Sequence, residues 1–169
     1  MIETDRLTLR AWQTSDLQFL DAILGDTEVM EFSDQGALSK EEQVSWLTAA
    51  RTWSHQDRLP GTLAIEQIDD RRVIGYIGLS RDLRRIGRRE AELGFRLAKS
   101  AWEHGFATEA AKGILEAAIG LDELERIVAI VDPHNYRSMY VLKRIGMSYQ
   151  KDIPFESYDY PDHLFVKNF

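Results

Sequence analysis

Apolar and polar residues alternate along several short stretches of the chain, a pattern typical of strands with one buried face. Turn-forming residues bound most of these stretches. Residues 125–131 form a further, nearly all-apolar run, which is typical of a strand covered on both faces. The seven strands predicted in this way span Arg6–Trp12, Gly61–Ile68, Arg72–Ser80, Glu90–Leu97, Glu125–Val131 and two segments of 147–169 around Pro154–Pro161.

Apolar residues at helical spacing predict four helices between these strands. Thr14–Asp16 supplies cap residues for the first helix, and Ser39 with Glu42 forms a capping box for the second. The third helix begins near Gly105, and the fourth covers Asn135–Ile145 and ends at a glycine. The predicted order is β-α-α-β-β-β-α-β-α-β-β, which indicates a mixed α/β (α+β) domain built in layers.

Length and charge narrow the class of protein. The 169 residues, with a formal net charge of −7, are expected to form a single domain over 1–169. Such a charge disfavours nucleic acid as a partner and favours a cationic one, such as an amine. The sequence has no apolar run of the roughly 18 residues needed to cross a bilayer, and its acidic start does not look like a signal peptide. We therefore expect a cytoplasmic protein without a membrane partner.

Cysteine and histidine usage excludes several kinds of chemistry. The chain has no cysteine, which rules out disulfides, thiolate metal sites and a cysteine nucleophile. Its four histidines show no metal-ligand spacing, so no metal site is predicted.

The most informative stretch runs from the strand Glu90–Leu97 into the helix that begins near Gly105. The first turn of a helix presents unpaired N–H groups and the positive end of the helix dipole, which together bind phosphate. Gly105 and Ala107 leave room for a diphosphate to approach the backbone. The stretch lacks both a Walker loop and a dinucleotide fingerprint. Its alternative interpretation is a buried, alanine-rich helix that follows a glycine.

Five motifs follow one another along the chain: TDRLTLR at 4–10, DTEVM at 26–30, ELGF at 92–95, WEHGFATEA at 102–110, and NYRS at 135–138 with RIGM at 144–147. In this order and spacing they resemble the motifs of the GNAT acetyltransferases, and within them the RimJ/RimL-like group that acts on ribosomal-protein N-termini. The resemblance covers nearly the whole sequence.

This resemblance implies a fold and a cofactor. The fold would be a mixed central sheet of six to seven strands with about four helices on both faces. Acetyl-CoA would be the cosubstrate, with its pantetheine arm along 95–97 and its pyrophosphate on the amides of 103–108. The cofactor-binding residues implied are Phe95, Arg96, Leu97, Trp102, Glu103, His104, Gly105, Phe106, Ala107, Thr108, Asn135 and Ser138. Glu103 and His104 stand where the family usually has a glycine and a basic residue.

Two roles in the chemistry have candidate residues, the hydrogen-bond donor to the leaving thiolate and the general base. Many members of the superfamily protonate the leaving thiolate with a tyrosine, but that position is Leu142 here. Ser138 shares a helical row with Leu142 and matches a serine of RimL-like enzymes, so we name it as the hydrogen-bond donor; the alternative is a capping or packing serine. Tyr140 is expected on another face of the helix. Glu92 is the first candidate for the general base and Glu156 the second, the alternative being solvated carboxylates.

The acceptor class follows from the absence of an obvious strong base. Deprotonating an α-amine at pH 7 costs roughly 1–1.4 kcal/mol, against about 4.6 kcal/mol for a lysine side chain. The acceptor is therefore predicted to be a protein or peptide N-terminal α-amine, which attacks the thioester directly. The alternatives are a small-molecule amine, amino acid or antibiotic as acceptor and, in another class, a non-catalytic acetyl-CoA-binding sensor module.

Three further groups of residues have two interpretations each. Five arginines between Arg81 and Arg89 are either a clamp for an acidic substrate or for the 3′-phosphate of the cofactor, or a solvated hairpin. Trp46 and Trp53 either wall a substrate cleft or pack in the core. The tail aromatics are a substrate edge or the contact of a homodimer; these are Tyr158, Tyr160 and Phe165.

Overall fold

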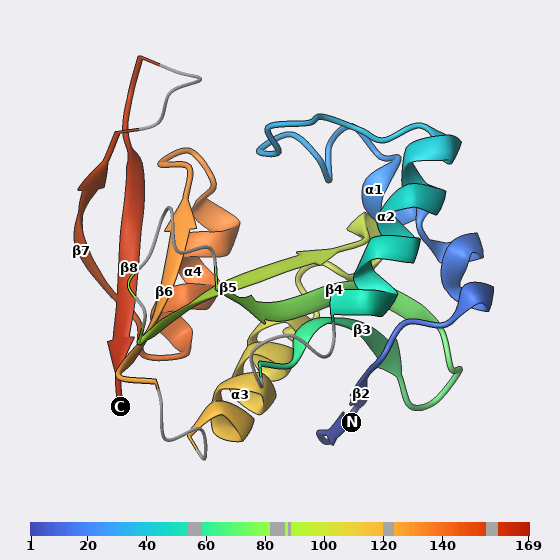
Figure 1. Ribbon diagram of the computed structural model, residues 1–169, viewed down its shortest axis with the longest axis horizontal. Coiled ribbons are helices and arrows are strands. Elements are labelled where there is room, and N and C mark those ends of the chain that lie inside the picture. Colours follow the sequence, from blue (N-terminus) through green and yellow to red (C-terminus); the bar gives the residue numbers. More distant parts are fainter. Residues whose placement is uncertain (54–58, 82–86, 88, 120–123, 155–158) are drawn as a thin grey trace.

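The computed structural model describes the chain except for residues 54–58, 82–86, 88, 120–123 and 155–158, and the side chain of residue 53 (Figure 1). The strands are β1 (Ile2–Glu3), β2 (Leu7–Arg10), β3 (Gly61–Gln67), β4 (Val73–Ser80), β5 (Glu90–Leu97), β6 (Arg126–Val131), β7 (Ser148–Ile153) and β8 (Asp162–Asn168). The helices are the 3-10 helix η1 (Thr14–Phe19), α1 (Asp21–Leu24), α2 (Lys40–Trp53), the 3-10 helix η2 (Lys99–Ala101), α3 (Phe106–Ala118) and α4 (Tyr136–Arg144).

The strands form one eight-stranded sheet in the order β1-β2-β3-β4-β5-β6-β8-β7. Every neighbouring pair is antiparallel except β5 and β6, which are parallel. The mixed α/β class is confirmed, but the expected six to seven strands were too few. The additional strand is β1, whose two residues pair with β2 and are too few to display alternation.

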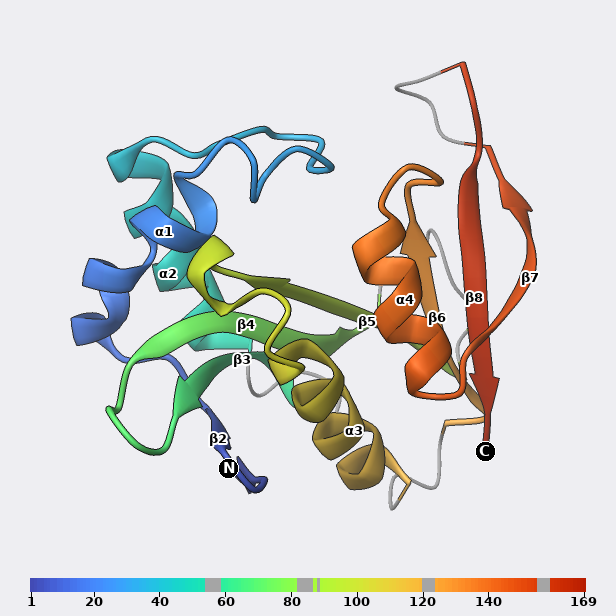
Figure 2. The same ribbon diagram turned by 180° about the vertical axis from the view of Figure 1, so that it is seen from behind.

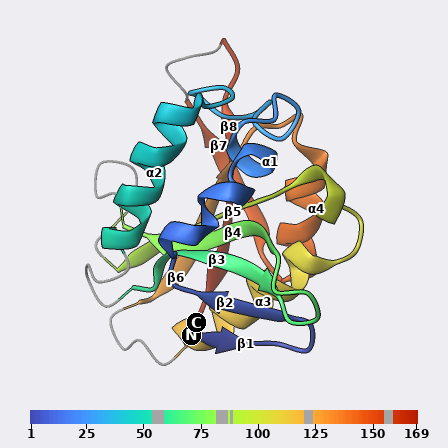
Figure 3. The same cartoon turned by 90° about the vertical axis from the view of Figure 1, so that its right-hand side faces the viewer.

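Helices cover both faces of the sheet, and each face has its own core. η1, α1 and α2 lie on one face, and α3 and α4 on the other (Figures 2 and 3). The α1–α2 core includes Trp12, Ile23 and Leu47, whereas the α3–α4 core includes Ile114 and Leu142. The strand predicted to be covered on both faces is β6, which lies inside the sheet between β5 and β8, and most of its side chains are buried.

The parallel pair β5–β6 separates after a short contact, and this places the functional site. Only three residues of β5 pair with β6, from Glu90 opposite Arg126 to Glu92 opposite Val128. Beyond Glu92, β5 stays paired with β4 up to Leu97 while β6 turns away from it (Figure 1). The last half of β5 is therefore an open sheet edge in the middle of the molecule.

Two helix ends follow the local sequence as predicted, and one does not: Thr14–Asp16 lie inside η1, whose N-cap residue is Gln13. The Ser39 N–H donates to Glu42 Oε2 at 2.7 Å, and the Glu42 N–H donates to Ser39 Oγ at 3.3 Å, which confirms the capping box at the start of α2. The hydrogen bond from the Ser39 backbone, followed by the one with its side chain, lowers the pKa of Glu42. At the other end of the fold, Gly146 follows α4 with φ 81°, a conformation that favours glycine.

A buried ionic cluster, not predicted from the sequence, joins η1 to the sheet. Arg10 donates to Asp16 through both terminal nitrogens, at 2.8 and 2.9 Å, and through Nε to Glu66 Oε2 at 2.6 Å. The hydrogen bond with Asp16 raises the pKa of Arg10, against the effect of burial.

Within the described residues, no helix combines the length and the apolar content that crossing a membrane requires.

Candidate functional site

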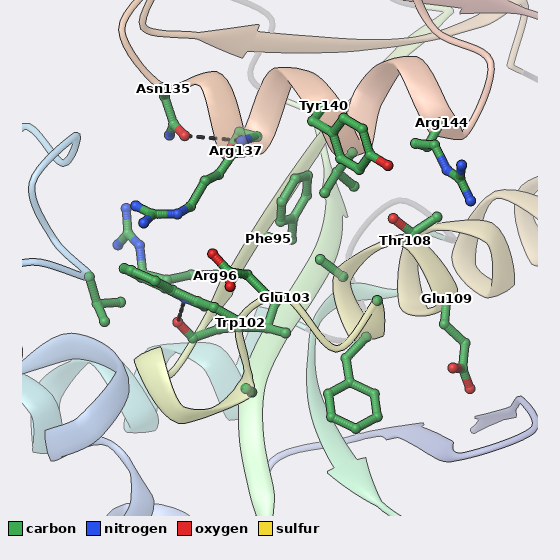
Figure 4. Close-up of a pocket in the computed structure, with 18 of the residues that line it drawn as sticks. Phe95, Arg96, Trp102, Glu103, Thr108, Glu109, Asn135, Arg137, Tyr140 and Arg144 are labelled. Carbon is green, nitrogen blue, oxygen red and sulfur yellow. Dashed lines mark hydrogen bonds between the residues drawn. The ribbon is translucent and has the colours of Figure 1, made fainter.

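A cleft of about 940 Å³ opens between α3, α4 and the free edge of β5 (Figure 4). We call it the large cleft. Its lining contains eleven of the twelve predicted cofactor residues, which are Phe95, Arg96, Leu97, Trp102, Glu103, Gly105, Phe106, Ala107, Thr108, Asn135 and Ser138. The structure therefore brings together residues that lie up to 43 positions apart in the sequence.

His104 is the predicted cofactor residue that does not line the large cleft. Its ring stacks on Phe106 with centroids 5.8 Å apart, and its Nδ1 lies 2.6 Å from the carbonyl oxygen of Trp102. These contacts turn the imidazole toward the loop itself, so His104 supports the loop with its side chain.

The register of β5 decides which backbone groups face the large cleft. In an antiparallel pair, every second residue directs its N–H and C=O toward the partner strand. The Ala98 N–H donates to Ile74 O at 2.8 Å, so the backbone groups of Arg96, two residues earlier, also point toward β4. The backbone N–H and C=O groups of Phe95 and Leu97 point toward the large cleft. The indole N–H of Trp102 donates to one of these cleft-facing groups, the Leu97 carbonyl, at 2.9 Å.

The start of α3 has the geometry of a phosphate site. Gly105 is the N-cap residue with φ 80°, and a Cβ added there would meet only Arg6 Nη2, at 3.7 Å. The first turn of α3 therefore faces the cleft with its N–H groups uncovered by a side chain at the cap. Glu103 also has a left-handed backbone, with φ 64°, which is strained for a residue other than glycine.

The wall formed by α4 differs from the predicted one. Leu142 is 1% exposed and packs in the core, whereas Tyr140 lines the cleft together with Arg137 and Ser138. The expectation that Tyr140 lies on another face was wrong, because burial of the apolar Leu142 turns the helix so that the polar neighbours of Ser138 face the cleft. Asn135 caps the helix, and its Oδ1 accepts the Ser138 N–H at 3.1 Å.

Two arginines of α4 stack on aromatic rings at the cleft. The guanidinium of Arg137 lies 4.6 Å from the centre of the Trp102 ring, and that of Arg144 lies 5.9 Å from the Tyr140 ring. Arg137 thus reaches from α4 across to the residue that follows η2. Figure 4 shows the Tyr140 hydroxyl on the side of Arg144 and Thr108, away from Asn135.

A second cavity, of about 380 Å³, lies on the opposite face of β5. We call it the acidic cavity, because four carboxylates line it: Asp34, Glu92, Asp132 and Asp162. Alternation of side chains along β5 places Glu92 and Arg96 on this face and Phe95 on the other. Phe32 and Arg96 line both cavities, so the two spaces adjoin at these side chains, on the part of β5 that no longer pairs with β6.

Trp46, Tyr76 and Arg96 line another part of the acidic cavity. Trp46 lies 5.2 Å from both Trp12 and Tyr76, so it packs in the core and lines the cavity at the same time. Burial raises the pKa of Tyr76, and the nearby Arg96 lowers it in part. Arg96 also contacts Met30 through Nη1, 2.8 Å from the sulfur. Trp53, the other tryptophan predicted here, has no described side chain.

The tail of the chain reaches the acidic cavity through Asp132. The Tyr160 hydroxyl donates to Asp132 Oδ2 at 3.0 Å, and its ring packs edge-on against His134. Phe165 is 2% exposed and belongs to the core. Tyr158 and the candidate base Glu156 lie outside the described residues, and the expected dimer contact stays a prediction.

The arginine cluster lies at the other end of β5. Arg81 donates to the Glu90 carbonyl at 3.3 Å, and Arg89 pairs with Glu125 at 2.5 Å. Neither arginine lines the two cavities. The remaining three, at 84, 85 and 88, lie outside the described residues. The two described arginines thus fit the interpretation as a hairpin with surface ion pairs.

Three carboxylates of the acidic cavity were missed by sequence reasoning. Asp132 directly follows β6, and Asp162 begins β8. Since these two strands are antiparallel neighbours, both residues lie at the same end of the strand pair. A polar residue directly after an apolar strand is a signal that could have identified Asp132. Asp34 sits in a loop without such a pattern. Among the residues that the structure describes, no group of three or more His, Cys, Asp or Glu side chains could hold a metal ion.

Comparisons with known proteins agree with this architecture. The model of the acetyltransferase (GNAT) domain family matches residues 6–148. YnaD of Bacillus subtilis (strain 168), an uncharacterized N-acetyltransferase, is 28% identical over 146 residues, which are 86% of this chain and 81% of YnaD.

Solved structures share the fold at low sequence identity. RimL, the ribosomal L7/L12 α-N-protein acetyltransferase in complex with coenzyme A, superposes with a TM-score of 0.81 at 17% identity, covering 98% of this chain and 95% of RimL. Spermidine N-acetyltransferase from Vibrio cholerae, in complex with CoA and spermine, gives 0.75 at 19% identity over 96% and 95% of the two chains. The predicted GNAT fold is confirmed, and one fold accommodates both a protein and a polyamine acceptor. The chain therefore belongs to the GNAT acetyltransferase family, enzymes that transfer an acetyl group from acetyl-CoA to an acceptor.

Proposed function

We propose that the protein acetylates a primary amine by direct transfer from acetyl-CoA, with the amine bound in the acidic cavity. One observation carries the proposal: the two cavities lie on opposite faces of β5, beside the point where it leaves β6, and share Phe32 and Arg96. A donor on one face and an acceptor on the other can meet through this gap. Because the chain has no cysteine, direct attack by the amine is favoured over an acetyl-cysteine intermediate.

The large cleft fits acetyl-CoA at two places. The amides of 103–108, with no side chain at Gly105, suit the pyrophosphate. The backbone groups of Phe95 and Leu97 that face the cleft suit the pantetheine arm, which would pair with them like an added strand, beside the amide of Asn135. When bound there, acetyl-CoA supplies an acetyl group activated as a thioester. We assign the N–H of Phe95 as the donor to the thioester oxygen.

Glu92 is the proposed general base. It is the last residue of β5 that pairs with β6, and its side chain lines the acidic cavity, so it lies next to the gap between the strands. A carboxylate at this place can accept the proton that the ammonium form must lose before its nitrogen attacks the thioester. The second proton of that nitrogen, released when the amide forms, goes to the leaving sulfur. Asp132 and Asp162 line the same cavity and would hold the amine in its cationic form beforehand.

Ser138 is the proposed donor of a hydrogen bond to the leaving sulfur. It lies half-buried in the first turn of α4 and lines the large cleft. Tyr140 lines the same wall and is the competing donor. Its hydroxyl is directed toward Thr108 in the first turn of α3, the end that suits the pyrophosphate, which favours Ser138 for the sulfur (Figure 4).

The favoured acceptor is the N-terminal α-amine of a protein or peptide, as in the RimJ/RimL-like group. An α-amine with pKa about 7.7–8.0 gives up its proton at pH 7 far more readily than a lysine side chain with pKa about 10.4. A single carboxylate beside the gap is enough for such an amine. The negative lining of the cavity favours a peptide whose first residues are neutral or basic.

A small cationic amine is the second candidate, and the size of the acidic cavity is the observation that favours it. A volume of about 380 Å³ is at the lower end of small-molecule sites. Part of its lining comes from segment 30–38, which contributes Met30, Phe32 and Leu38. A compact acceptor with more than one positive charge would match four carboxylates in such a space.

An acceptor panel tests the proposal after calorimetry has measured binding of acetyl-CoA. CoA release is followed with peptides that have a free or a blocked N-terminus, with lysine derivatives, and with mono- and diamines. Turnover of free-N-terminus peptides alone supports the first candidate, and turnover of diamines alone supports the second. Tight binding of acetyl-CoA without CoA release for any acceptor would overturn the enzymatic proposal and favour a sensor module.

A further inference from the structure

The N-terminal segment contacts both the loop that precedes α3 and the first turn of α3. Arg6 donates to the carboxylate of Glu109 twice, from its backbone N–H and from Nε, both at 2.8 Å. Its Nη1 donates to the His104 carbonyl at 3.2 Å, and its guanidinium lies 4.5 Å from the centre of the Phe106 ring. The hydroxyl of Thr4 adds a hydrogen bond to Glu109 Oε1 at 2.6 Å.

Glu109 occupies a place where a carboxylate is unfavourable for the proposed ligand. It lies in the first turn of α3, next to the amides that suit a pyrophosphate. Arg6 neutralises it, and together with Thr4 draws the carboxylate toward the N-terminal strand and away from α4 (Figure 4). Burial raises the pKa of Glu109, but the hydrogen bonds from Thr4 and Arg6 outweigh burial, and the pKa lies below its ordinary value.

The loop between η2 and α3 needs such support. Glu103 and Gly105 both have positive φ, so two of the three residues of 103–105 are in the left-handed region. Strained conformations persist only where the surroundings fix them. The residue between them, His104, is held through its carbonyl by Arg6 and through its ring by the Trp102 carbonyl.

We propose that Arg6 and Glu109 form a positioning pair that sets the shape of the pyrophosphate loop, so that the N-terminal segment is a functional part of the acetyl-CoA site. The inference rests on the proposed binding of acetyl-CoA in the large cleft. Glu109 is assigned a favourable role in binding an anion, although its own charge is negative. Arg6 acts through the loop, with its guanidinium engaged by Glu109, His104 and Phe106.

Calorimetry of acetyl-CoA binding to Glu109→Ala tests the inference by the sign of the effect. If the pair positions the loop, Glu109→Ala weakens binding by about 10-fold or more, since charge-assisted hydrogen bonds are lost. If Arg6 instead contacts the phosphates directly, removal of the neighbouring negative charge tightens binding. Glu116→Ala, an exposed change on the same helix, is the matched control and is expected to leave the affinity unchanged.

The pair is then tested as a unit. Arg6→Ala is expected to weaken binding about as much as Glu109→Ala, and the double variant no more than either single change, because both remove the same support. Thr4→Val removes the hydrogen bond to Glu109 and the two side-chain hydrogen bonds with the Leu7 backbone, and keeps the Arg6–Glu109 ion pair. It is expected to weaken binding by about 3-fold and serves if the larger changes impair folding. Additive losses in the double variant would overturn the inference.

Two readouts separate loop positioning from a general loss of structure. Hydrogen exchange at the amides of 103–108 is expected to accelerate in Arg6→Ala, while exchange in β3 and β4 stays unchanged. The KM for the acceptor is expected to stay within about 2-fold of wild type, because the acidic cavity lies on the other face of β5. Wild-type protein that fails to bind acetyl-CoA would refute the proposed function. If the wild type binds acetyl-CoA and Glu109→Ala binds it with the same affinity, only the positioning pair would be refuted.

Discussion

The two faces of β5 are built by different means. On the side of the large cleft, the groups offered to a ligand are mostly backbone amides from one continuous stretch, 95–108, with Gly105 providing room. On the side of the acidic cavity, they are side chains from β5, a loop and two strand ends. A site made of main-chain groups produces a local motif in the sequence, whereas a site made of distant side chains exists only in the fold.

The largest effect expected is at the backbone site. Gly105→Val places a side chain where the pyrophosphate would approach, and it does so at a residue with φ 80°. This change is expected to weaken acetyl-CoA binding more than about 100-fold by steric exclusion. Gly36→Val is the matched control, because Gly36 also has positive φ, 64°, but faces open space. Both changes cost about 1–2 kcal/mol of backbone strain. Equal calorimetric affinities in the two variants would mean that the phosphates bind elsewhere.

The next effect is expected on the other face. Glu92→Gln keeps the shape of the side chain and removes the base, so kcat is expected to fall about 100-fold. The affinity for acetyl-CoA is expected to stay within about 2-fold, since Glu92 lines only the acidic cavity. Steady-state kinetics with calorimetry measures both. Asp162→Asn, in the same cavity, is expected to raise the KM for the acceptor and to leave kcat nearly unchanged. If kcat is unchanged in Glu92→Gln, Glu92 is not the general base.

A smaller effect distinguishes the two donors on α4. Ser138→Ala is expected to lower kcat about 10-fold, the value of one hydrogen bond to a charged sulfur. Tyr140→Phe is expected to change kcat less than about 2-fold, because its hydroxyl lies toward Thr108 (Figure 4). Rates from the CoA-release assay decide between them. The reverse result would transfer the role to Tyr140.

The smallest expected effect is a gain. Glu103→Gly removes a carboxylate from the lining of the large cleft and relieves a residue at φ 64°. Acetyl-CoA is expected to bind about 3-fold tighter, and the free energy of unfolding to rise by about 1 kcal/mol. Calorimetry and denaturant titration measure the two changes independently. Weaker binding in this variant would assign a positive role to the Glu103 carboxylate.

Local signals in the sequence predicted much of the backbone site. The bounds of β5 agree with the alternation of Glu90–Leu97, and α3 begins directly after Gly105. The capping box of Ser39 and Glu42 is present as expected. Each of these features depends on neighbours within a few residues, which is why a pattern along the chain suffices.

What the sequence did not reveal depends on tertiary contacts. A helical row containing Ser138 and Leu142 could not show which side of α4 enters the core, so Tyr140 was misplaced. The Arg10 cluster joins residues 56 positions apart. The convergence of Asp34 and Asp132 with Glu92 requires the loop and the ends of the strands to be in place.

Alternation of side chains along β5 constrains how this protein can diversify. Under the proposed function, changes at Glu92 and Arg96 alter the surroundings of the amine, while the cleft-facing backbone groups of Phe95 and Leu97 keep their positions. An insertion of one residue within 92–97 would turn the residues after it to the opposite face of the sheet. Binding of the donor and binding of the acceptor would then be lost together. Point substitutions at even positions are therefore the open route to new acceptors, and this strand is expected to tolerate no change in length.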